Sequence, residues 1–349
     1  MEIIHDTLIN WYAKNRRDLP WRDHPTPYQV WLSEVILQQT RVNQGRDYYL
    51  RFIERWPSVT NLAQASEEEV LKMWQGLGYY SRARNLHHCA QQIINDYDGE
   101  FPADFEKLKQ LKGIGEYTAA AIASIAFNLP YAVVDGNVYR VLARLYDIET
   151  PININEGQTL YTCLANELLN REQPRLHNQA MMEFGALHCT PKNPKCLQCP
   201  FQAQCLAFSH QTVMLRPVKL PKVKVTTRYV NYLVIRIKDS IYLHKRSGND
   251  IWRNLYDFPC VESETAMTAD EVVATEQFQQ LVDGKPFTIT KVSSLFTHKL
   301  THRTILAQFI ELILDNELLQ IQTKDVFLTR ESDLGNYPIP RLIDLYLNT

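Results

Sequence analysis

The sequence has no apolar run that approaches the roughly 18 residues of a membrane-spanning helix. The first residues, MEIIHDTLINWYAKNRRD, lack the apolar core and the small-residue cleavage site of a secretory signal. Internal repeats and low-complexity tracts are also absent. These absences argue against a membrane protein, a secreted protein and a repeat protein, so we expect a cytoplasmic globular protein.

Cysteine is scarce as well, with 7 in 349 residues. Four of the seven lie in the stretch CTPKNPKCLQCPFQAQC, from Cys189 to Cys205. Because a reducing compartment disfavours disulfides, a group of four cysteines predicts a metal site. The scattered cysteines Cys89, Cys163 and Cys260 are instead typical of small buried apolar residues.

Acidic residues are missing from one long stretch, since none lies between Phe184 and Lys238. The formal net charge of the whole chain is only −2, so the total conceals this local excess of positive charge. Clustered basic residues are typical of a surface that contacts a polyanion, and equally of a solvated linker. The nine basic residues of the stretch are Lys192, Lys195, Arg216, Lys219, Lys222, Lys224, Arg228, Arg236 and Lys238.

The residue patterns divide the chain into two parts of different fold class. With 349 residues, of which 45% are hydrophobic and 22% charged, the chain is long enough for two separate cores. Up to about residue 205, apolar positions recur at helical spacing in VWLSEVILQQTRV, EEVLKMWQGLGYYSRARNLHHCAQQII and YTAAAIASIAF, and strand-like alternation is scarce. We predict an all-α domain over residues 1–205, a linker over 206–227 and an α+β domain over 228–349.

The α+β prediction depends on a change of pattern after the cysteines. The segments YVNYLVIRI, SIYLHKR and TILAQFIELIL are rich in β-branched and aromatic residues and predict strands. TADEVVATEQFQQLVD predicts one helix, and PRLIDLYL predicts a terminal helix. The preceding SHQTVMLRPVKLPKVKV contains two prolines and no periodicity, as an interdomain linker does.

Two glycines, Gly113 and Gly115, separate two helical patterns in FEKLKQLKGIGEYTAAAIASIAF. Backbone N–H groups at such a turn and at the start of the second helix face outward together, so they can hold a phosphate. A helical hairpin closed by glycine for packing alone explains the same pattern.

Two carboxylates lie where their surroundings suit them to catalysis. Asp135, in VVDGNVYRVLARL, precedes a helix whose dipole favours the ionised form and suits it to stabilising cationic charge. Glu34, in WLSEVILQQT, lies between Trp31 and Leu37, and apolar neighbours raise a carboxyl pKa toward that of a general acid. An ordinary helix N-cap at Asp135 and a solvated helix glutamate at Glu34 are the simpler alternatives.

The cysteines are spaced C-x6-C-x2-C-x5-C. Zinc ribbons usually show two C-x2-C pairs, so this spacing favours a compact iron–sulfur cluster and leaves zinc possible. The expected ligands are Cys189, Cys196, Cys199 and Cys205.

Taken together, LKGIGEYTA, VDGNVYRV and the cysteine run resemble the endonuclease III superfamily of helix-hairpin-helix base-excision DNA glycosylases, over most of residues 1–205. Within it, DLPWR, WLSEVILQQTRV and GLGYYSRARNL resemble the adenine DNA glycosylase (MutY-type) branch, which removes adenine mispaired with 8-oxoguanine. The resemblance implies a [4Fe-4S] cluster as cofactor. It also implies duplex DNA with 8-oxoguanine:adenine or guanine:adenine mispairs as partner, and we expect a monomer.

The same resemblance implies roles for the matching residues. Glu34 would donate a proton to the adenine ring. Asp135 would stabilise the oxocarbenium-like sugar, or the intermediate that water resolves, and Asn137 and Tyr117 would support the site. The cluster would fix a basic loop against the DNA backbone without redox turnover.

Further matching residues would bind the substrate. Trp21 and Arg22 would line the adenine pocket, whereas Gln39 and Tyr79 would be wedges inserted at the lesion, filling the gap left when the base is extruded. Thr40 and Leu77 would contact the oxidised guanine, and Gly78 is a further expected substrate-binding residue. Gln179 is also expected there, at a position where some members carry Glu.

The second part, from YLVIRIKDSIYLHKRSGNDIWRNLYDFP onward, resembles a Nudix-fold domain. The Glu-rich R-E-x-x-E-E helix that binds metal in Nudix hydrolases does not follow, so diphosphate hydrolysis is not expected and the domain is predicted to read the lesion. The triplet Phe296-Thr297-His298 resembles the Phe-Ser-His loop that contacts 8-oxoguanine in this branch, with Thr in place of Ser.

Lyase members of the superfamily carry a lysine where this chain has Tyr117, so a Schiff base with the sugar cannot form from that position. We therefore predict a monofunctional glycosylase that hydrolyses the N-glycosidic bond, and Lys112 is the nearby amine that would contradict this. Two alternatives remain: a pyrimidine-damage glycosylase/lyase of the same superfamily, and a non-catalytic DNA-damage binding protein with a structural zinc site.

Overall fold

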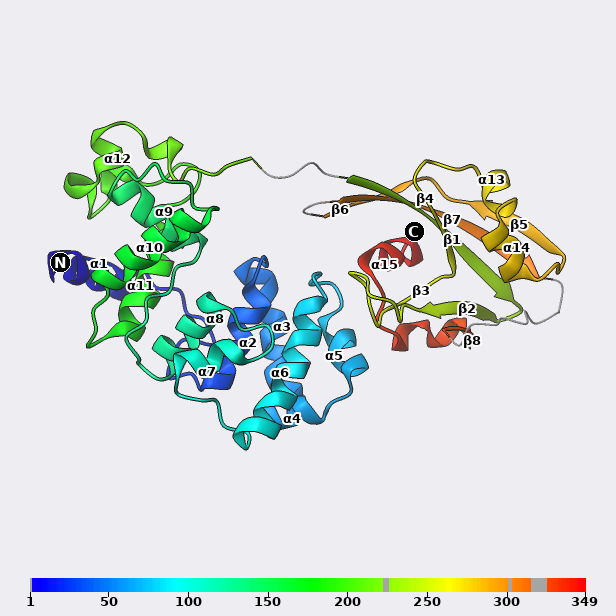
Figure 1. Ribbon diagram of the computed structural model, residues 1–349, viewed down its shortest axis with the longest axis horizontal. Coiled ribbons are helices and arrows are strands. Elements are labelled where there is room, and N and C mark those ends of the chain that lie inside the picture. Colours follow the sequence, from blue (N-terminus) through cyan, green and yellow to red (C-terminus); the bar gives the residue numbers. More distant parts are fainter. Residues whose placement is uncertain (1, 222–225, 301–302, 315–324) are drawn as a thin grey trace. The chain divides into compact units, whose positions relative to one another are not determined.

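The computed structural model describes residues 2–221, 226–300, 303–314 and 325–349. Contacts divide the chain into two compact units, whose elements are labelled in Figure 1. The first unit contains Met1–Gln64 and Asn85–Pro221, and the second contains Ala65–Arg84 and Lys222–Thr349. The second unit is therefore discontinuous in sequence. Two residues of the basic stretch, Lys222 and Lys224, lie outside the described residues.

The first unit is helical, which confirms the all-α prediction. Short π-helical or 3-10 segments supplement its helices: η1 Ile122–Ala126, η2 Cys196–Gln198, η3 Gln202–Gln204 and η4 Val213–Leu215. None of the helices that the structure describes has both the length and the apolar character required to cross a membrane. The α-helices are α1 Glu2–Asn15, α2 Pro27–Leu37, α3 Val42–Arg55, α4 Val59–Gln64, α6 Ser81–Tyr97 (whose first residues belong to the second unit), α7 Phe105–Gln110, α8 Glu116–Ala121, α9 Gly136–Leu145, α10 Asn155–Leu168, α11 Pro174–Leu187 and α12 Leu206–Ser209.

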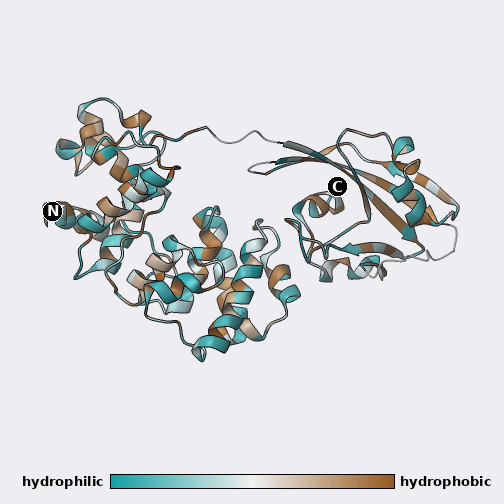
Figure 2. Ribbon diagram, in the orientation of Figure 1, coloured by the Kyte–Doolittle hydropathy of each residue, from teal (hydrophilic) through white to brown (hydrophobic). Residues whose placement is uncertain are grey.

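Sequence-encoded caps fix where these helices begin. Thr26 and Gln29 form a reciprocal capping box at the start of α2, where Pro27 is the first helical residue. Hydrophobic and hydrophilic residues share the same helices (Figure 2), as expected of amphipathic helices around a core. Leu8, Leu142 and Phe184, from α1, α9 and α11, are buried together in that core.

The glycine turn between α7 and α8 is a tight hairpin. Gly113 has φ +79°, and a Cβ atom built there would lie 2.8 Å from Cβ of Asn85, so both the backbone and the neighbouring side chain require glycine. After α8 the chain passes directly into the π-helical segment η1, where the hydroxyl of Ser124 donates to the carbonyl of Ala120 at 2.7 Å.

The second unit is built on a mixed sheet of eight described strands, with the order β3-β2-β1-β7-β5. Strand β4 also pairs with β1, β6 with β7, and β8 with β2. The long strands β1 and β7 are parallel and the other pairs are antiparallel, which confirms the α+β prediction. The strands are β1 Thr226–Ile237, β2 Ser240–Lys245, β3 Tyr256–Asp257, β4 Cys260–Ser263, β5 Phe287–Val292, β6 Phe296–Lys299, β7 Arg303–Leu314 and β8 Val326–Arg330.

The helices of this unit are α5 Glu67–Trp74, α13 Ala269–Val273, α14 Glu276–Val282 and α15 Arg341–Leu347, with a 3-10 segment η5 Glu331–Asn336. The prediction of one helix over TADEVVATEQFQQLVD is wrong, because the structure has two. Thr275 interrupts the helical run: its backbone is extended and its side chain accepts a hydrogen bond from the N–H of Phe278, so it caps a new helix.

Helix α5 belongs to this unit because hydrogen bonds join its segment to C-terminal residues. The Tyr80 hydroxyl donates to the carbonyl of Ile339 at 3.0 Å. The Tyr256 hydroxyl donates to Oε2 of Glu68 at 2.7 Å, and Nζ of Lys72 to the carbonyl of Tyr337 at 2.9 Å. A purely sequential division of the chain misses this grouping.

Candidate active site

A cavity of about 480 Å³ lies within the first unit, a volume typical of sites for small molecules. Its lining comes from α2, the start of α3, α8, η1, α9 and α11, and from the segments that precede α2, α3 and α9. Nine of the residues singled out in the sequence line it: Trp21, Arg22, Glu34, Gln39, Thr40, Tyr117, Asp135, Asn137 and Gln179.

Glu34 on α2 receives a short hydrogen bond from the hydroxyl of Tyr117 on α8. Burial raises the pKa of Glu34 to about 7, against the lowering effect of the Tyr117 hydrogen bond and with a smaller raising effect from Asp135. The apolar surroundings come partly from Leu37, as predicted, but Trp31 does not line the cavity. Its ring packs in the core against Phe101, with centroids 5.4 Å apart.

Asp135 caps the N-terminus of α9. Its Oδ1 accepts from the backbone N–H groups of Asn137 and Val138, both at 2.8 Å, and its Oδ2 accepts from Nδ2 of Asn137 at 2.7 Å. Burial raises the pKa of Asp135, although these hydrogen bonds and the charge of Arg140 oppose the rise. The expectation that the helix N-terminus favours the ionised form meets an opposing effect here, because desolvation favours the neutral carboxyl. Asp135 therefore both caps α9 and lines the cavity.

Arg140 holds the side chain of Asn137 in turn. Nη2 of Arg140 donates to Oδ1 of Asn137 at 2.9 Å and to the carbonyl of Gly185 at 2.6 Å. A Cβ atom at Gly185 would lie 2.6 Å from Cβ of Asn137, so glycine is what lets α11 approach α9 here. Nε of Arg140 donates to the carbonyl of Cys189 at 2.7 Å, which connects the Asn137 side to the start of the cysteine segment.

Glu183 on α11 is a cavity residue that the sequence analysis missed. Only 1% of its side chain is exposed, and its carboxylate accepts from Arg17 at 2.5 Å and from Arg22 at 2.6 Å. Burial raises the pKa of Glu183, but the hydrogen bonds from the two arginines outweigh this and lower it to about 2. Its position four residues after Gln179, on the same face of one helix, was the signal available in the sequence.

Gln179 and Trp21 have defined partners at the cavity. Oε1 of Gln179 accepts from the hydroxyl of Tyr12 at 3.1 Å. The ring of Trp21 packs edge-on to that of Tyr49, with centroids 5.1 Å apart. These contacts fix the two side chains where the sequence predicts substrate-binding residues.

Two predicted wedge residues have left-handed backbone conformations. Gln39 has φ +57° and is exposed after the end of α2. Tyr79, in the second unit, has φ +49° and is 45% exposed, and the preceding Gly78 has φ +72°. The carbonyl of Gly78 accepts from Nε1 of Trp74 at 3.0 Å, and this hydrogen bond stabilises the turn that presents Tyr79. Leu77, beside it, is buried.

Phe296, Thr297 and His298 lie on strand β6, which pairs with β7. Successive side chains alternate between the two faces of a strand, so Thr297 faces away from its two neighbours and is exposed. Phe296 packs edge-on against Phe309, with centroids 5.2 Å apart, and His298 lies beside Trp252, with centroids 6.3 Å apart. The hydroxyl and the imidazole of the triplet therefore lie on opposite faces of the strand.

Gly113 and Gly115 do not line the cavity, and they remain predicted phosphate contacts at the start of α8. Lys112 is exposed and also does not line the cavity. Its backbone N–H donates to Oε1 of Gln92 at 3.0 Å.

All four clustered cysteines line a second cavity in the first unit. Nη1 of Arg144 lies 3.4 Å from Sγ of Cys189, and burial raises the pKa of the Cys199 thiol to about 11. Four thiols beside one arginine are a donor set that fits an anionic iron–sulfur cluster, because metal ions favour the thiolate form. Within the part of the chain that the structure describes, no group of three or more His, Cys, Asp or Glu side chains is arranged to hold a single metal ion.

Comparisons with known proteins agree with this architecture. Residues 32–159 match the HhH-GPD superfamily of base excision DNA repair proteins, and residues 231–349 match the NUDIX domain. The adenine DNA glycosylase of Buchnera aphidicola subsp. Schizaphis graminum is 33% identical over 304 residues, which cover 87% of this chain and 85% of the relative.

Solved structures show the same fold in the helical part. A thermostable thymine-DNA glycosylase is 28% identical with a TM-score of 0.56, over 60% of this chain and 96% of that chain. An endonuclease III solved as a non-covalent DNA complex is 24% identical with a TM-score of 0.52, over 60% of this chain and 95% of that chain. The protein is thus a DNA glycosylase, and by its two matched domains and its near full-length relatives it belongs to the adenine DNA glycosylase family.

Proposed function

We propose that this protein hydrolyses the N-glycosidic bond of adenine mispaired with 8-oxoguanine, or with guanine, in duplex DNA. The observation that carries the proposal is the pairing of Glu34 with Tyr117 in the same cavity as Asp135 and Asn137. The adenine DNA glycosylases among its relatives support adenine as the base removed. An extruded base needs a cavity of this kind, because an enzyme cannot reach the bond inside the stack.

Glu34 is the proton donor in this proposal. A carboxyl with a pKa of about 7 is protonated in a large fraction of molecules at neutral pH. As the bond between C1′ and the base nitrogen breaks, its electron pair goes to the base, and the proton from Glu34 neutralises the departing adenine. The hydroxyl of Tyr117 donates to Oε2 of Glu34 and so orients the carboxyl group.

Asp135 stabilises the positive charge that develops on the sugar. Three hydrogen bonds from Asn137 and Val138 fix both of its oxygens, so its charge is oriented before the reaction begins. Water then adds to C1′ and gives up a proton to a carboxylate, which leaves an abasic site.

A hydrolytic outcome without strand cleavage is part of the proposal. Within the described residues, the cavity lining contains no lysine, and Tyr117 cannot form an imine with the sugar. The exposed position of Lys112, away from the cavity lining, supports the same conclusion.

We also propose that the four cysteines hold a [4Fe-4S] cluster. Such a cluster binds each thiolate at its own iron, in agreement with four thiols around one cavity. When bound, the cluster supplies structural support, and the segment that it fixes carries Lys192 and Lys195 for contact with DNA phosphates.

The C-terminal part of the second unit is the proposed reader of 8-oxoguanine. This base differs from guanine by a carbonyl at C8 and a protonated N7, so a few hydrogen bonds must provide the discrimination. The exposed hydroxyl of Thr297 is suited to such a contact.

A strand-scission assay tests the proposal. The protein is incubated with duplexes that carry 8-oxoguanine opposite adenine, and the products are resolved with and without alkali. We expect breaks at the adenine position only after alkali, and no covalent adduct after borohydride. Breaks without alkali, or efficient borohydride trapping, would contradict the monofunctional mechanism. An intact adenine strand after alkali would contradict the proposed activity.

A further inference from the structure

Trp252 lies directly behind the triplet that is proposed to read the lesion. It belongs to the loop between β2 and β3, and only 4% of its surface is exposed. Its ring is 6.3 Å from that of His298, with the two planes inclined at 42°. Because Thr297 faces the opposite side of β6, Trp252 contacts the strand from its more buried face, where Phe296 and His298 are half-buried.

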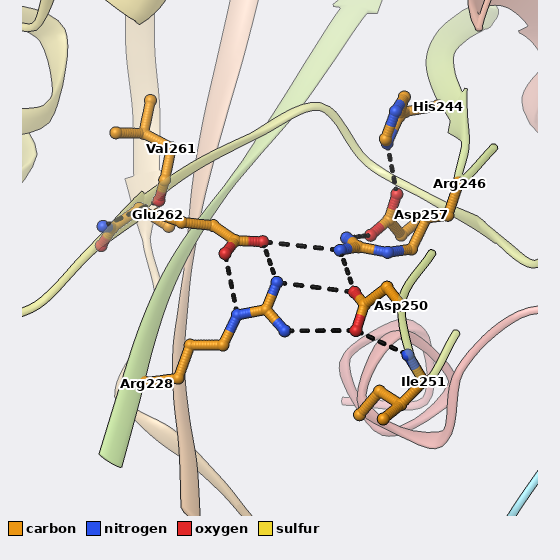
Figure 3. A network of polar contacts seen from close by, with 9 residues as sticks. Arg228, His244, Arg246, Asp250, Ile251, Asp257, Val261 and Glu262 are labelled. Carbon is orange, nitrogen blue, oxygen red and sulfur yellow. Dashed lines mark hydrogen bonds and ion pairs between the residues drawn. The ribbon is translucent and has the colours of Figure 1, made fainter. Parts of the chain in front are cut away.

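Arg246 holds Trp252 in place. The guanidinium carbon lies 5.5 Å from the centroid of the Trp252 ring, in a cation–π contact. Nη1 of Arg246 donates to Oδ2 of Asp257 at 2.7 Å, and Nη2 forms a short hydrogen bond with Asp250. Figure 3 shows Arg246 between these two carboxylates. Asp257 is fully buried and its other oxygen lies 2.9 Å from Nδ1 of His244, so the anchor of the arginine is itself fixed.

A second arginine closes the network. Arg228 on β1 pairs with Glu262 on β4 and lies 3.5 Å from Asp250, as Figure 3 shows. Both ends of the Trp252 loop are tied as well, since the N–H of Arg246 donates to the carbonyl of Leu255 at 2.9 Å and the N–H of Asn254 to the carbonyl of Arg246 at 2.7 Å. Trp252 therefore rests on a charged network joined to four strands of the sheet.

We infer that Trp252 is a positioning residue for lesion discrimination: through His298 it fixes β6, so that the Thr297 hydroxyl meets the base edge at hydrogen-bond distance. The inference rests on the proposed reading role of Thr297. Its physical basis is that two edge atoms distinguish 8-oxoguanine from guanine, and hydrogen bonds to them weaken steeply when distance or angle changes. A reader of this kind needs a rigid support beneath the contact residue.

The test uses the full-length protein and compares four variants with wild type. Trp252→Leu keeps an apolar side chain but removes the ring beside His298. Trp252→Phe restores a ring. Thr297→Ala removes the proposed contact itself. Ile251→Ala, at an exposed neighbour in the same loop, is the matched control.

Single-turnover rates and affinities are measured on 8-oxoguanine:adenine and guanine:adenine duplexes at one fixed salt concentration. We expect Trp252→Leu to lower the preference for the 8-oxoguanine duplex by about tenfold, the effect of one good base-edge contact. Its rate on the guanine duplex should stay close to wild type, because the proposed catalytic carboxylates lie in the first unit. Trp252→Phe should recover most of the preference, and Ile251→Ala should retain all of it.

The imidazole proton signals of His298, followed by NMR in the same variants, report whether its surroundings have changed. If Trp252→Leu shifts these signals yet keeps the wild-type preference, while Thr297→Ala loses it, the positioning role is wrong and the reading role stands. Equal losses on both duplexes for Trp252→Leu would also overturn the inference, since they indicate general damage to DNA binding. If neither Thr297→Ala nor Trp252→Leu changes the preference, the proposed reading role of this strand fails with it.

Discussion

The hydroxyl of Tyr117 on α8 donates a hydrogen bond to Oε2 of Glu34 on α2, although 83 residues separate them in sequence. The phenol occupies the position where lyase relatives are expected to carry an amine. In the proposed mechanism Tyr117 thus supplies no amine nucleophile, and its hydroxyl orients the carboxyl group of Glu34, the proposed acid. Substitutions at Tyr117 and at the two cavity carboxylates, Glu34 and Asp135, have effects on activity that can be measured.

Glu34→Gln should lower the rate of adenine release by at least about 10²–10⁴-fold, the usual contribution of a positioned general acid. The amide keeps the size of the side chain but cannot supply the proton, so affinity for the mispaired duplex should change little. Single-turnover kinetics and a binding titration separate the two effects. Glu54→Gln, at an exposed glutamate of α3, is the matched control. Near-normal turnover of Glu34→Gln would remove this residue from the mechanism.

Tyr117→Phe should shift the loss of activity toward higher pH. The Tyr117 hydrogen bond stabilises the ionised form of Glu34 and so lowers its pKa, and its removal should raise that pKa above about 7. Protonated Glu34 is the active form, so activity is present below its pKa and lost as the pH rises through it. The pH profile of the single-turnover rate measures the shift. A descending limb that stays in place, or moves to lower pH, would show that the hydrogen bond does not control this acid.

Asp135→Asn should reduce the rate by at least about 100-fold while leaving the protein folded. Asparagine is also a good N-cap, so α9 keeps its start and only the charge is lost. Asp135→Ala should lose activity and also about 1 kcal/mol of stability. Thermal unfolding and single-turnover rates distinguish the two variants. A large drop in the melting temperature of Asp135→Asn would mean that the charge serves the fold.

Glu183→Gln should destabilise the first unit by ~3–5 kcal/mol, because Arg17 and Arg22 would be left beside a neutral group. The pKa of Glu183 is lowered from 4.5 to about 2, so its contribution to stability is fully present above pH 4.5 and is lost as the pH falls toward about 2. Urea unfolding of wild type and variant should therefore give free energies that converge in acid. A difference in unfolding free energy that stays constant between pH 4.5 and pH 2 would show that the charge of Glu183 does not stabilise the first unit.

The purified protein should be brown, with the broad near-visible absorption of an iron–sulfur cluster. Replacing Cys199 by Ser removes one of the four proposed cluster ligands and should diminish the colour. The prediction that Cys163 is buried is wrong, because it lies exposed on α10, and Cys163→Ser, outside the group of four, should leave the spectrum unchanged. A colourless protein that contains zinc would refute the cluster.

Much of the site was predictable because sequence motifs identify residue types in fixed local settings. Asp135 before a helix and Glu34 on an apolar helix are local patterns, and both residues line the cavity. Glu183 was not predictable in this way, because a glutamate within a helix has the same local pattern whether it is solvated or buried. Its spacing from Gln179 indicates the helix face on which it lies, but its pairing with Arg17 and Arg22 is long-range and no local pattern shows it.

In the second unit, too, local sequence patterns predicted the elements but not the contacts between distant residues. Helix and strand composition predicted its α+β class, but not the break at Thr275, where a cap and a helix-interior residue look alike in sequence. The triplet at Phe296 was found by resemblance, yet its strand pairing decides that Thr297 and His298 face opposite ways. The inclusion of α5 could not be predicted, because it depends on side chains that meet across hundreds of residues.

The discontinuity of the second unit also sets an order for its assembly during synthesis. The Tyr80 hydroxyl and the carbonyl that accepts its hydrogen bond lie 259 residues apart, so the ribosome delivers the donor long before the acceptor. Helix α5 can form its own turns at once, but the hydrogen bonds from Lys72 and Tyr80 must wait until Tyr337 and Ile339 have emerged from the ribosome. The contacts that tie the segment around Tyr79 to the second unit are thus formed after the strands proposed to read the lesion have been synthesised, and a chain terminated before Tyr337 lacks them.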